Sequence, residues 1–186
     1  MKMKIETMDW AIWLAIILPI IALAGYFSGI EAVLLLSFLL PLFIYIKNEF
    51  LVRQLDWKPE YSVGIAVLDE DHKKLLDMVL TLFKAMESAQ SKDEAERVLN
   101  ELLNYTVEHF DREEVLMKKH DYPDLAAHLA EHRAMKTKAA EFRDKFQSNS
   151  MEVSRDMLRY LQEWLINHIN KTDKAYSNFL VGKGEH

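Results

Sequence analysis

The chain of 186 residues contains no cysteine. This absence excludes disulfide bonds, zinc sites with thiolate ligands and iron–sulfur clusters held by cysteine. It does not decide the redox compartment, because a reducing cytoplasm permits cysteine-free proteins without requiring them. Glycine and proline are scarce, with five and four residues, and no glycine lies between Gly64 and Gly182. A stretch of this length without glycine favours continuous helices.

The lysine and arginine residues do not form a continuous basic stripe of the kind that binds nucleic acid. Residues 1–55 hold four basic and four acidic residues, so the net charge of −6 lies entirely on residues 56–186. An acidic domain of this kind argues against binding to nucleic acid. Length and charge together predict two parts: a neutral segment over residues 1–55 and an acidic globular domain over residues 56–186.

Charge is almost absent from the N-terminal segment. Trp10 to Phe27 and Ala32 to Ile46 carry none, and Glu31 is the only charged residue between them. The first stretch has 18 residues, or about 27 Å of helix, which just meets a bilayer core of about 30 Å. We therefore expect two transmembrane helices that form a hairpin and anchor the chain in the lipid bilayer.

The flanking charges predict the orientation of this hairpin. Lys2 and Lys4 precede the first stretch, and Lys47 and Arg53 follow the second, whereas the turn between them has no lysine or arginine. Positive charge favours the cytoplasmic side. We expect a two-pass protein of the cell (inner) membrane, with both termini and the acidic domain in the cytoplasm.

Two other interpretations of this segment stay open. Ala22-Leu23-Ala24 has the small-x-small form of a signal-peptide cleavage site, although Glu6 and Asp9 and the second apolar stretch argue against it. A pair of core or interfacial helices is less favoured, because both stretches are apolar on every face.

The acidic domain has the pattern of an all-α, antiparallel up-down four-helix bundle. Apolar residues recur at helical spacing, and we expect four helices joined by short connections after an irregular arm over residues 55–67. Ser91 and Glu94 have the form of a capping box that opens the second helix. The expected helices span residues 69–89, 92–119, 124–147 and 151–170, with a turn at His120–Pro123.

Seven residues of the types that bind metals occur on these four helices or directly after the last one. Residues four apart lie on one helix face, so the second and third helices can each present two ligands. Five imidazoles and two carboxylates exceed the needs of one tetrahedral zinc, and they suit two octahedral irons that share the carboxylates and keep one position open. The seven residues are His72, His109, Glu113, His128, His132, His168 and Asp173.

Asp173 does not follow the regular spacing. It lies five residues after His168, about 140° away from the common face of a regular helix. We therefore predict a break near Asn170, Lys171 and Thr172, by which the helix ends, tightens or bulges, followed by a short helical tail.

These motifs resemble those of the hemerythrins, specifically the bacterial ones, over roughly residues 56–180. The resemblance implies two irons, bridged by Glu113 and Asp173 with an oxo or hydroxo group. It also implies that His128, His132 and His168 complete one iron. His72 and His109 would then leave the other iron with an open position, which binds dioxygen reversibly.

Positions near these ligands also suggest roles for several further residues. The candidates for an apolar oxygen pocket are Leu75, Phe110, Met135, Trp164, Ile169 and Asn170, although the aliphatic and aromatic members are equally well explained as bundle core. Many hemerythrins have a bulky apolar residue where this chain has Asn170. The residues interpreted as solvated surface are Asp71, Glu108, Glu114 and Glu131, and His120 and His186 are interpreted as turn and tail residues.

The sequence thus favours an oxygen carrier or store that is not an enzyme, tethered to a membrane beside an oxidase or oxygenase that consumes oxygen. A sensor domain for oxygen, redox state or nitric oxide is the second hypothesis, and it would need an output through the membrane helices or a partner. A di-iron enzyme acting on peroxide, nitric oxide or ferrous iron is the third. No obvious proton donor for such an enzyme was found in the sequence.

Overall fold

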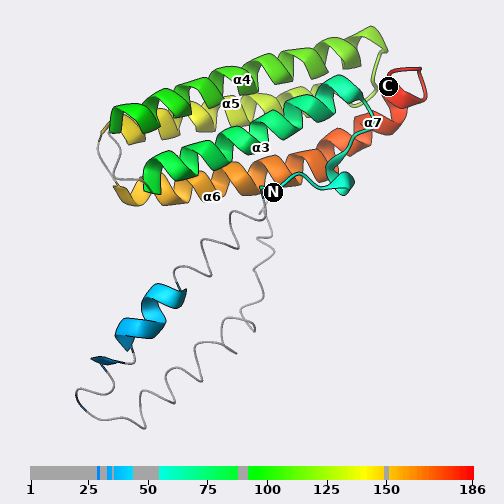
Figure 1. Ribbon diagram of the computed structural model, residues 1–186. Coiled ribbons are helices and arrows are strands. Elements are labelled where there is room, and N and C mark those ends of the chain that lie inside the picture. Colours follow the sequence, from blue (N-terminus) through cyan, green and yellow to red (C-terminus); the bar gives the residue numbers. More distant parts are fainter. Residues whose placement is uncertain (1–28, 30–32, 35, 44–54, 88–91, 149–150) are drawn as a thin grey trace. The chain divides into compact units, whose positions relative to one another are not determined.

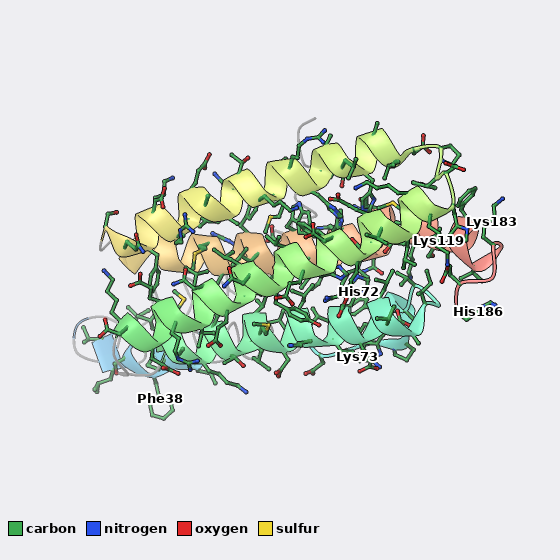
Figure 2. The ribbon with its side chains drawn as sticks, turned by 90° about the horizontal axis from the view of Figure 1, so that it is seen from above. Phe38, His72, Lys73, Lys119, Lys183 and His186 are labelled. Carbon is green, nitrogen blue, oxygen red and sulfur yellow. The ribbon has the colours of Figure 1, made fainter. Side chains whose placement is uncertain are left out.

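The computed structural model describes residues 29, 33–34, 36–43, 55–87, 92–148 and 151–186. The chain divides into two compact units, Met1–Leu51 and Val52–His186. In the first unit, residues 33–34 and 36–43 are helical, and most of their apolar side chains are exposed; Phe38, labelled in Figure 2, is 82% exposed.

Within the part of the chain that the structure describes, we find no helix with both the length and the apolar character needed to cross a bilayer. Most of the two stretches expected to cross it, residues 10–27 and 32–46, lies outside the described residues. The hairpin therefore stays a prediction.

The second unit is a four-helix bundle (Figure 1). Its main helices are α3 (Ala66–Glu87), α4 (Lys92–Lys119), α5 (Leu125–Gln147) and α6 (Met151–Asn167). Helices α3 and α5 each pack against both α4 and α6, so the four helices close a ring in chain order. The described residues of this unit form helices and turns without a strand. The expectation of an all-α bundle is confirmed.

Helix α3 begins three residues before the predicted position. An arm containing the short helix η1 (Pro59–Tyr61) leads into it. The Asp69 carboxylate accepts hydrogen bonds from the Ser62 hydroxyl at 2.6 Å and from the Val63 backbone N–H at 2.7 Å. Asp69 therefore lies within the first turn, where an acidic side chain is favourable, rather than at the helix start. Helix α4 opens with Lys92, and Ser91 of the expected capping box lies outside the described residues.

The predicted turn between the second and third helices is confirmed. Asp121 adopts a positive φ of 52°, and the N–H of Tyr122 donates to the Met117 carbonyl at 3.0 Å. This left-handed residue is a common way to end a helix. The turn reverses the chain, so α5 runs back along α4.

The predicted interruption of the last helix is a widening rather than a break. After α6 the chain continues as the π-helix η2 (His168–Asp173) and then as α7 (Lys174–Val181). Of the three departures expected near residues 170–172, the structure has the bulge, and it spans six residues. The helical tail through Tyr176 is confirmed.

Two apolar clusters fill the bundle. The larger cluster extends along α3, α4, α5 and α6 and includes Leu82, Leu99 and Met157, all with no exposed surface. The smaller one joins the arm to α4 and α7 through Val63, Met117 and other residues. In Figure 2, His72 lies among the side chains between the helices, and the next residue, Lys73, lies on the outside.

Gly64 provides a test of how the arm joins the bundle. Its φ of +72° belongs to the left-handed region, whereas an added Cβ would meet only Val181 at an ordinary contact distance of 3.6 Å. Gly64→Ala should therefore lower the free energy of unfolding by about 1–2 kcal/mol, as the cost of the left-handed conformation alone. Chemical denaturation followed by circular dichroism measures this change.

The matched control is Gly182→Ala at the end of α7. Gly182 has a helical φ of −63°, and an added Cβ would meet the Asn178 carbonyl oxygen at 3.3 Å. Its substitution adds this close contact but no left-handed strain, and it should change stability by less than that of Gly64. An equal loss at both positions would contradict the conformational explanation.

Candidate metal centre

Five imidazoles and two carboxylates meet inside the bundle. One comes from α3, two from α4, two from α5 and two from the ends of η2. None is more than 4% exposed. The structure thus brings together all seven residues that the sequence pattern predicts as metal ligands: His72, His109, Glu113, His128, His132, His168 and Asp173.

Three of the imidazoles form one set. His132 Nε2 lies 2.9 Å from His128 Nε2 and 3.2 Å from His168 Nε2. Neutral imidazoles cannot satisfy three ring nitrogens that point at one another, because each pair needs a shared proton. A cation at their meeting point would satisfy all three, and with Glu113 they form a group that could hold a metal ion.

The carboxylate of Glu113 lies between this set and the other two imidazoles. Its Oε2 is 3.7 Å from His128 Nε2 and 3.2 Å from His132 Nε2. Its Oε1 is 3.7 Å from His72 Nε2 and 3.4 Å from His109 Nε2. Each oxygen therefore faces a different set, and this arrangement suits a carboxylate that bridges two ions.

Asp173 is divided in the same way. Its Oδ1 lies 3.2 Å from His168 Nε2 and 4.0 Å from His128 Nε2, and its Oδ2 lies 3.4 Å from His72 Nε2. The π-helix makes this possible, because its wider turn returns Asp173 to the inner face that a regular α-helix would carry it past. The two carboxylates together separate a three-imidazole position from a two-imidazole position.

Several buried atoms in this cluster have no hydrogen-bond partner among the described residues. They include both ring nitrogens of His72, both carboxylate oxygens of Asp173 and Oε2 of Glu113. Buried polar atoms are nearly always paired, since an unpaired one costs free energy. Nε2 of His72, Oε2 of Glu113 and both carboxylate oxygens of Asp173 are unpaired atoms that could bind metal, so the residues fit a pair of metal ions, and nitrogen and oxygen donors without thiolate suit iron.

The buried carboxylates of the cluster are stabilised by positive charge beside them. Burial opposes ionisation of Glu113, but His109 and the other imidazoles outweigh it and hold the pKa of Glu113 well below its usual range. Burial likewise opposes the charged form of His72, but Asp173 and Glu113 outweigh it and raise the pKa of His72 to about 9. Protons supply this charge when no metal is bound, and metal binding must release them.

A second layer of carboxylates holds three of the histidines by their other ring nitrogen. His109 Nδ1 donates to Asp71 at 3.3 Å, and His132 Nδ1 donates to Glu114 at 3.2 Å. His168 Nδ1 lies 3.2 Å from the Glu131 carboxylate. Such partners fix the orientation and basicity of metal-binding histidines.

The interpretation of these acidic residues as solvated surface was wrong for Asp71, which is buried, and for Glu114, which is half-buried, whereas Glu131 is exposed as expected. Asp71 is only 5% exposed and accepts further hydrogen bonds from Tyr105 and Arg112, each at 2.6 Å. Burial opposes its ionisation, but the contacts with His109 and Arg112 outweigh this and lower its pKa. The side chain of Glu131 is half exposed, yet His168 lowers its pKa to about 2. Glu108 is exposed, as expected.

The position of an acidic residue beside a ligand does not by itself identify these contacts. Asp71, Glu114 and Glu131 each lie next to a ligand, about 100° around their own helix. From there each reaches a histidine on the next helical segment of the chain, whereas Glu108, which also lies next to a ligand, is exposed.

Tyr176 was missed as a site residue. It has no exposed surface, and its hydroxyl donates a hydrogen bond to Glu113 Oε1. Burial and the charge of Glu113 raise the pKa of Tyr176 well above its usual value, which keeps the hydroxyl protonated as a donor. The sequence pattern gave it only as part of the helical tail.

Four of the six oxygen-pocket candidates lie in the apolar core, and the other two are half-buried. Leu75, Phe110, Met135 and Ile169 are at most 4% exposed and belong to the larger apolar cluster. Trp164 and Asn170 are half-buried. The Asn170 amide donates to the Ile166 carbonyl at 2.9 Å, so this donor is already engaged with its own helix.

Comparison with known proteins gives one consistent result. The sequence profile of the hemerythrin HHE cation-binding domain matches residues 63–180. A bacteriohemerythrin of Methylococcus capsulatus is 37% identical over 117 residues, which cover 63% of this chain and 88% of that protein. A hemerythrin-like protein of Naegleria gruberi is 30% identical over 128 residues, covering 67% of this chain and 92% of the relative. The crystal structure of a wild-type hemerythrin superposes with a TM-score of 0.60 at 32% identity, covering 67% of this chain and 96% of that one.

Asp71 allows the second layer to be tested. Asp71→Asn keeps the size of the side chain but removes the charge that orients His109, so iron affinity should fall by about 10–100-fold. Titration of ferrous iron against a chelator measures the affinity. Asp77→Asn, an exposed position on the same helix, is the control and should bind as the unchanged protein does. Equal affinities in the two variants would contradict the assigned role.

Proposed function

The chain belongs to the hemerythrin family, and from this premise we propose that it binds dioxygen reversibly at a di-iron centre. Glu113 and Asp173 would bridge the irons. His128, His132 and His168 would hold one of them, and His72 and His109 the other. The matched relatives are hemerythrins, which bind oxygen, rather than enzymes.

The unequal division of the imidazoles is the observation that carries this proposal. Two shared carboxylates and three imidazoles face one position, whereas the same carboxylates and only two imidazoles face the other. An ion at the second position has one protein ligand fewer, and a small molecule can occupy the place left open. A pair of ferrous ions can lend two electrons to dioxygen and recover them.

The surroundings favour binding over further reaction. Leu75, Phe110 and Ile169 are at most 1% exposed and exclude water from the neighbourhood of the ligands. Tyr176 lies close to the centre, but its hydroxyl proton is held by Glu113. A set rich in neutral imidazoles suits ferrous iron, and dry apolar walls suppress side reactions.

The membrane tether is the second part of the proposal. Two uncharged stretches, residues 10–27 and 32–46, carry flanking lysines and an arginine on their outer sides only. Most of the described helical residues within the second stretch are apolar and exposed, among them Val33, Leu34 and Phe38 at 63–82%. Apolar exposure of this extent calls for lipid or protein cover. We propose a two-pass hairpin that places the di-iron domain on the cytoplasmic side.

Such a tether suggests a role in oxygen delivery. Dioxygen is apolar and concentrates in lipid, so a carrier held at the membrane would load and unload beside an oxidase or oxygenase that consumes oxygen there. A sensor for oxygen or nitric oxide is the alternative, and the same oxygen-binding centre would serve it.

Reversible oxygenation tests the proposed activity. The reduced, iron-loaded protein should develop a visible absorption band in air and lose it when the oxygen pressure is lowered. Immediate, irreversible oxidation with turnover of added peroxide would instead support an enzyme. His109→Ala is the matched variant: it removes one of two imidazoles at the open position, so both the band and part of the iron should be lost. Two irons retained in that variant would contradict the ligand assignment.

Protease mapping in oriented membrane vesicles tests the tether. If both termini are cytoplasmic, residues 56–186 should be protected in right-side-out vesicles and cleaved in inside-out ones. Cleavage in right-side-out vesicles would refute the orientation, and recovery of the chain without membranes would refute the tether itself.

A further inference from the structure

The indole of Trp164 is in direct contact with the imidazole of a predicted metal ligand. Trp164 lies one turn before His168 on α6, and its indole stacks on the His168 imidazole with ring centroids 4.2 Å apart and planes 17° from parallel. Its edge also meets the ring of Phe110 at 5.7 Å and 60°. Phe110 in turn stacks on His132 at 3.7 Å and 7°. The indole therefore contacts one ligand imidazole, His168, directly. It is connected to a second ligand imidazole, His132, through the ring of Phe110.

Trp164 is also the member of this aromatic group that solvent reaches. It is half-buried, whereas Phe110, His132 and His168 are at most 4% exposed. The group thus forms a continuous path of π-systems from the surface to the three-imidazole position. The larger apolar cluster, which surrounds Phe110 and Ile169, insulates its inner members from water.

We propose that Trp164 is the point at which an external one-electron donor reduces the oxidised di-iron centre. This inference rests on the proposed function, because an oxygen carrier that has lost electrons to dioxygen must regain them before it can bind again. Each donor molecule loses one electron, and two such electrons return two ferric ions to the ferrous state. Electron transfer weakens steeply with distance, and rings in contact shorten the gap between the donor and the buried ligands.

A second path to the surface exists and gives the alternative outcome. The hydroxyl of Tyr105 donates to Asp71 at 2.6 Å, and Asp71 accepts from His109 at 3.3 Å. This path runs through two hydrogen bonds rather than ring contacts, and it leads to the two-imidazole position. Lys74 Nζ lies 3.9 Å from the centre of the Tyr105 ring and covers it. The stacked rings at Trp164 therefore form the more direct connection.

The absence of cysteine allows the two paths to be compared in the full-length, iron-loaded protein. Asn167→Cys and Lys74→Cys each place a single thiol at an exposed position, the first one turn from Trp164 and the second beside Tyr105. A photoactive ruthenium complex on that thiol injects one electron after a flash, under anaerobic conditions. The loss of ferric absorption reports when the electron arrives, and iron content is measured for every variant.

Injection from position 167 should be several-fold faster than injection from position 74. Trp164→Leu should slow the first and leave the second unchanged, whereas Trp57→Leu, which removes a half-buried indole from the arm, should slow neither. Equal rates from the two labels, or a faster rate from position 74, would overturn the proposal and favour the Tyr105 path. Position 167 adjoins the ligand His168, so the comparison of labels alone does not test the indole. Should Trp164→Leu lose iron, Trp164→Met takes its place, because it fills the site without a ring; an unchanged rate from position 167 in that variant would overturn the proposal.

These measurements are separate from the test of oxygen binding. Electron arrival is followed without oxygen, so a centre that fails to oxygenate reversibly can still show which path is used. A normal oxygenation band combined with an unchanged injection rate in Trp164→Leu would refute this inference and leave the proposed function standing.

Discussion

The structure of the bundle depends on two buried carboxylates that are shared between two sets of imidazoles. Glu113 and Asp173 have no exposed surface, and their ionic partners among the described residues are imidazoles rather than lysine or arginine. Two such charges are very costly to bury without compensation. Imidazoles must therefore be brought to the same level of the bundle as the carboxylates. Helices α3, α4 and α5 each contribute at least one, and the π-helix η2, which continues α6, contributes another. The two apolar clusters then pack around this polar layer rather than through it.

The outer carboxylates connect the helices in a regular order. Asp71 on α3 holds a histidine of α4, Glu114 on α4 holds one of α5, and Glu131 on α5 holds one of η2. Each helix thus fixes the orientation of a ligand on the segment that follows it in the chain. Because these contacts cross helix interfaces, rotation of any one helix would disturb a ligand on its neighbour as well as its own. Metal binding and helix packing are coupled through these contacts.

This arrangement explains which features could be predicted from the sequence. The four helices and six convergent ligands follow from helical spacing, which is a property of each segment alone. The five-residue gap before Asp173 predicts a distortion, but the choice among an end, a tightening and a bulge depends on packing; the observed π-helix keeps α7 in line to bring Tyr176 to Glu113. The histidine contacts of Asp71, Glu114 and Glu131 could not be predicted, because their partners lie on other helices and the rotation of one helix against another is not visible in the periodicity of either.

The two metal positions differ in how firmly the protein holds them, and this difference bears on function. In the three-imidazole position, both His132 and His168 have an outer carboxylate. In the other, Asp71 contacts His109, whereas no outer carboxylate contacts His72 among the described residues; Nδ1 of His72 and Nδ1 of His168 both lack a hydrogen-bond partner there. A ligand without an outer partner is oriented mainly by the ion that it binds. The position with fewer imidazoles has one outer carboxylate contact against two. On the proposed function, a metal ion held there could accept and release a small molecule while the three-imidazole position kept the carboxylate bridges in place. The surface contact through Trp164 is at the three-imidazole position, so oxygen and electrons would reach the centre from different sides without competing for the same ligand.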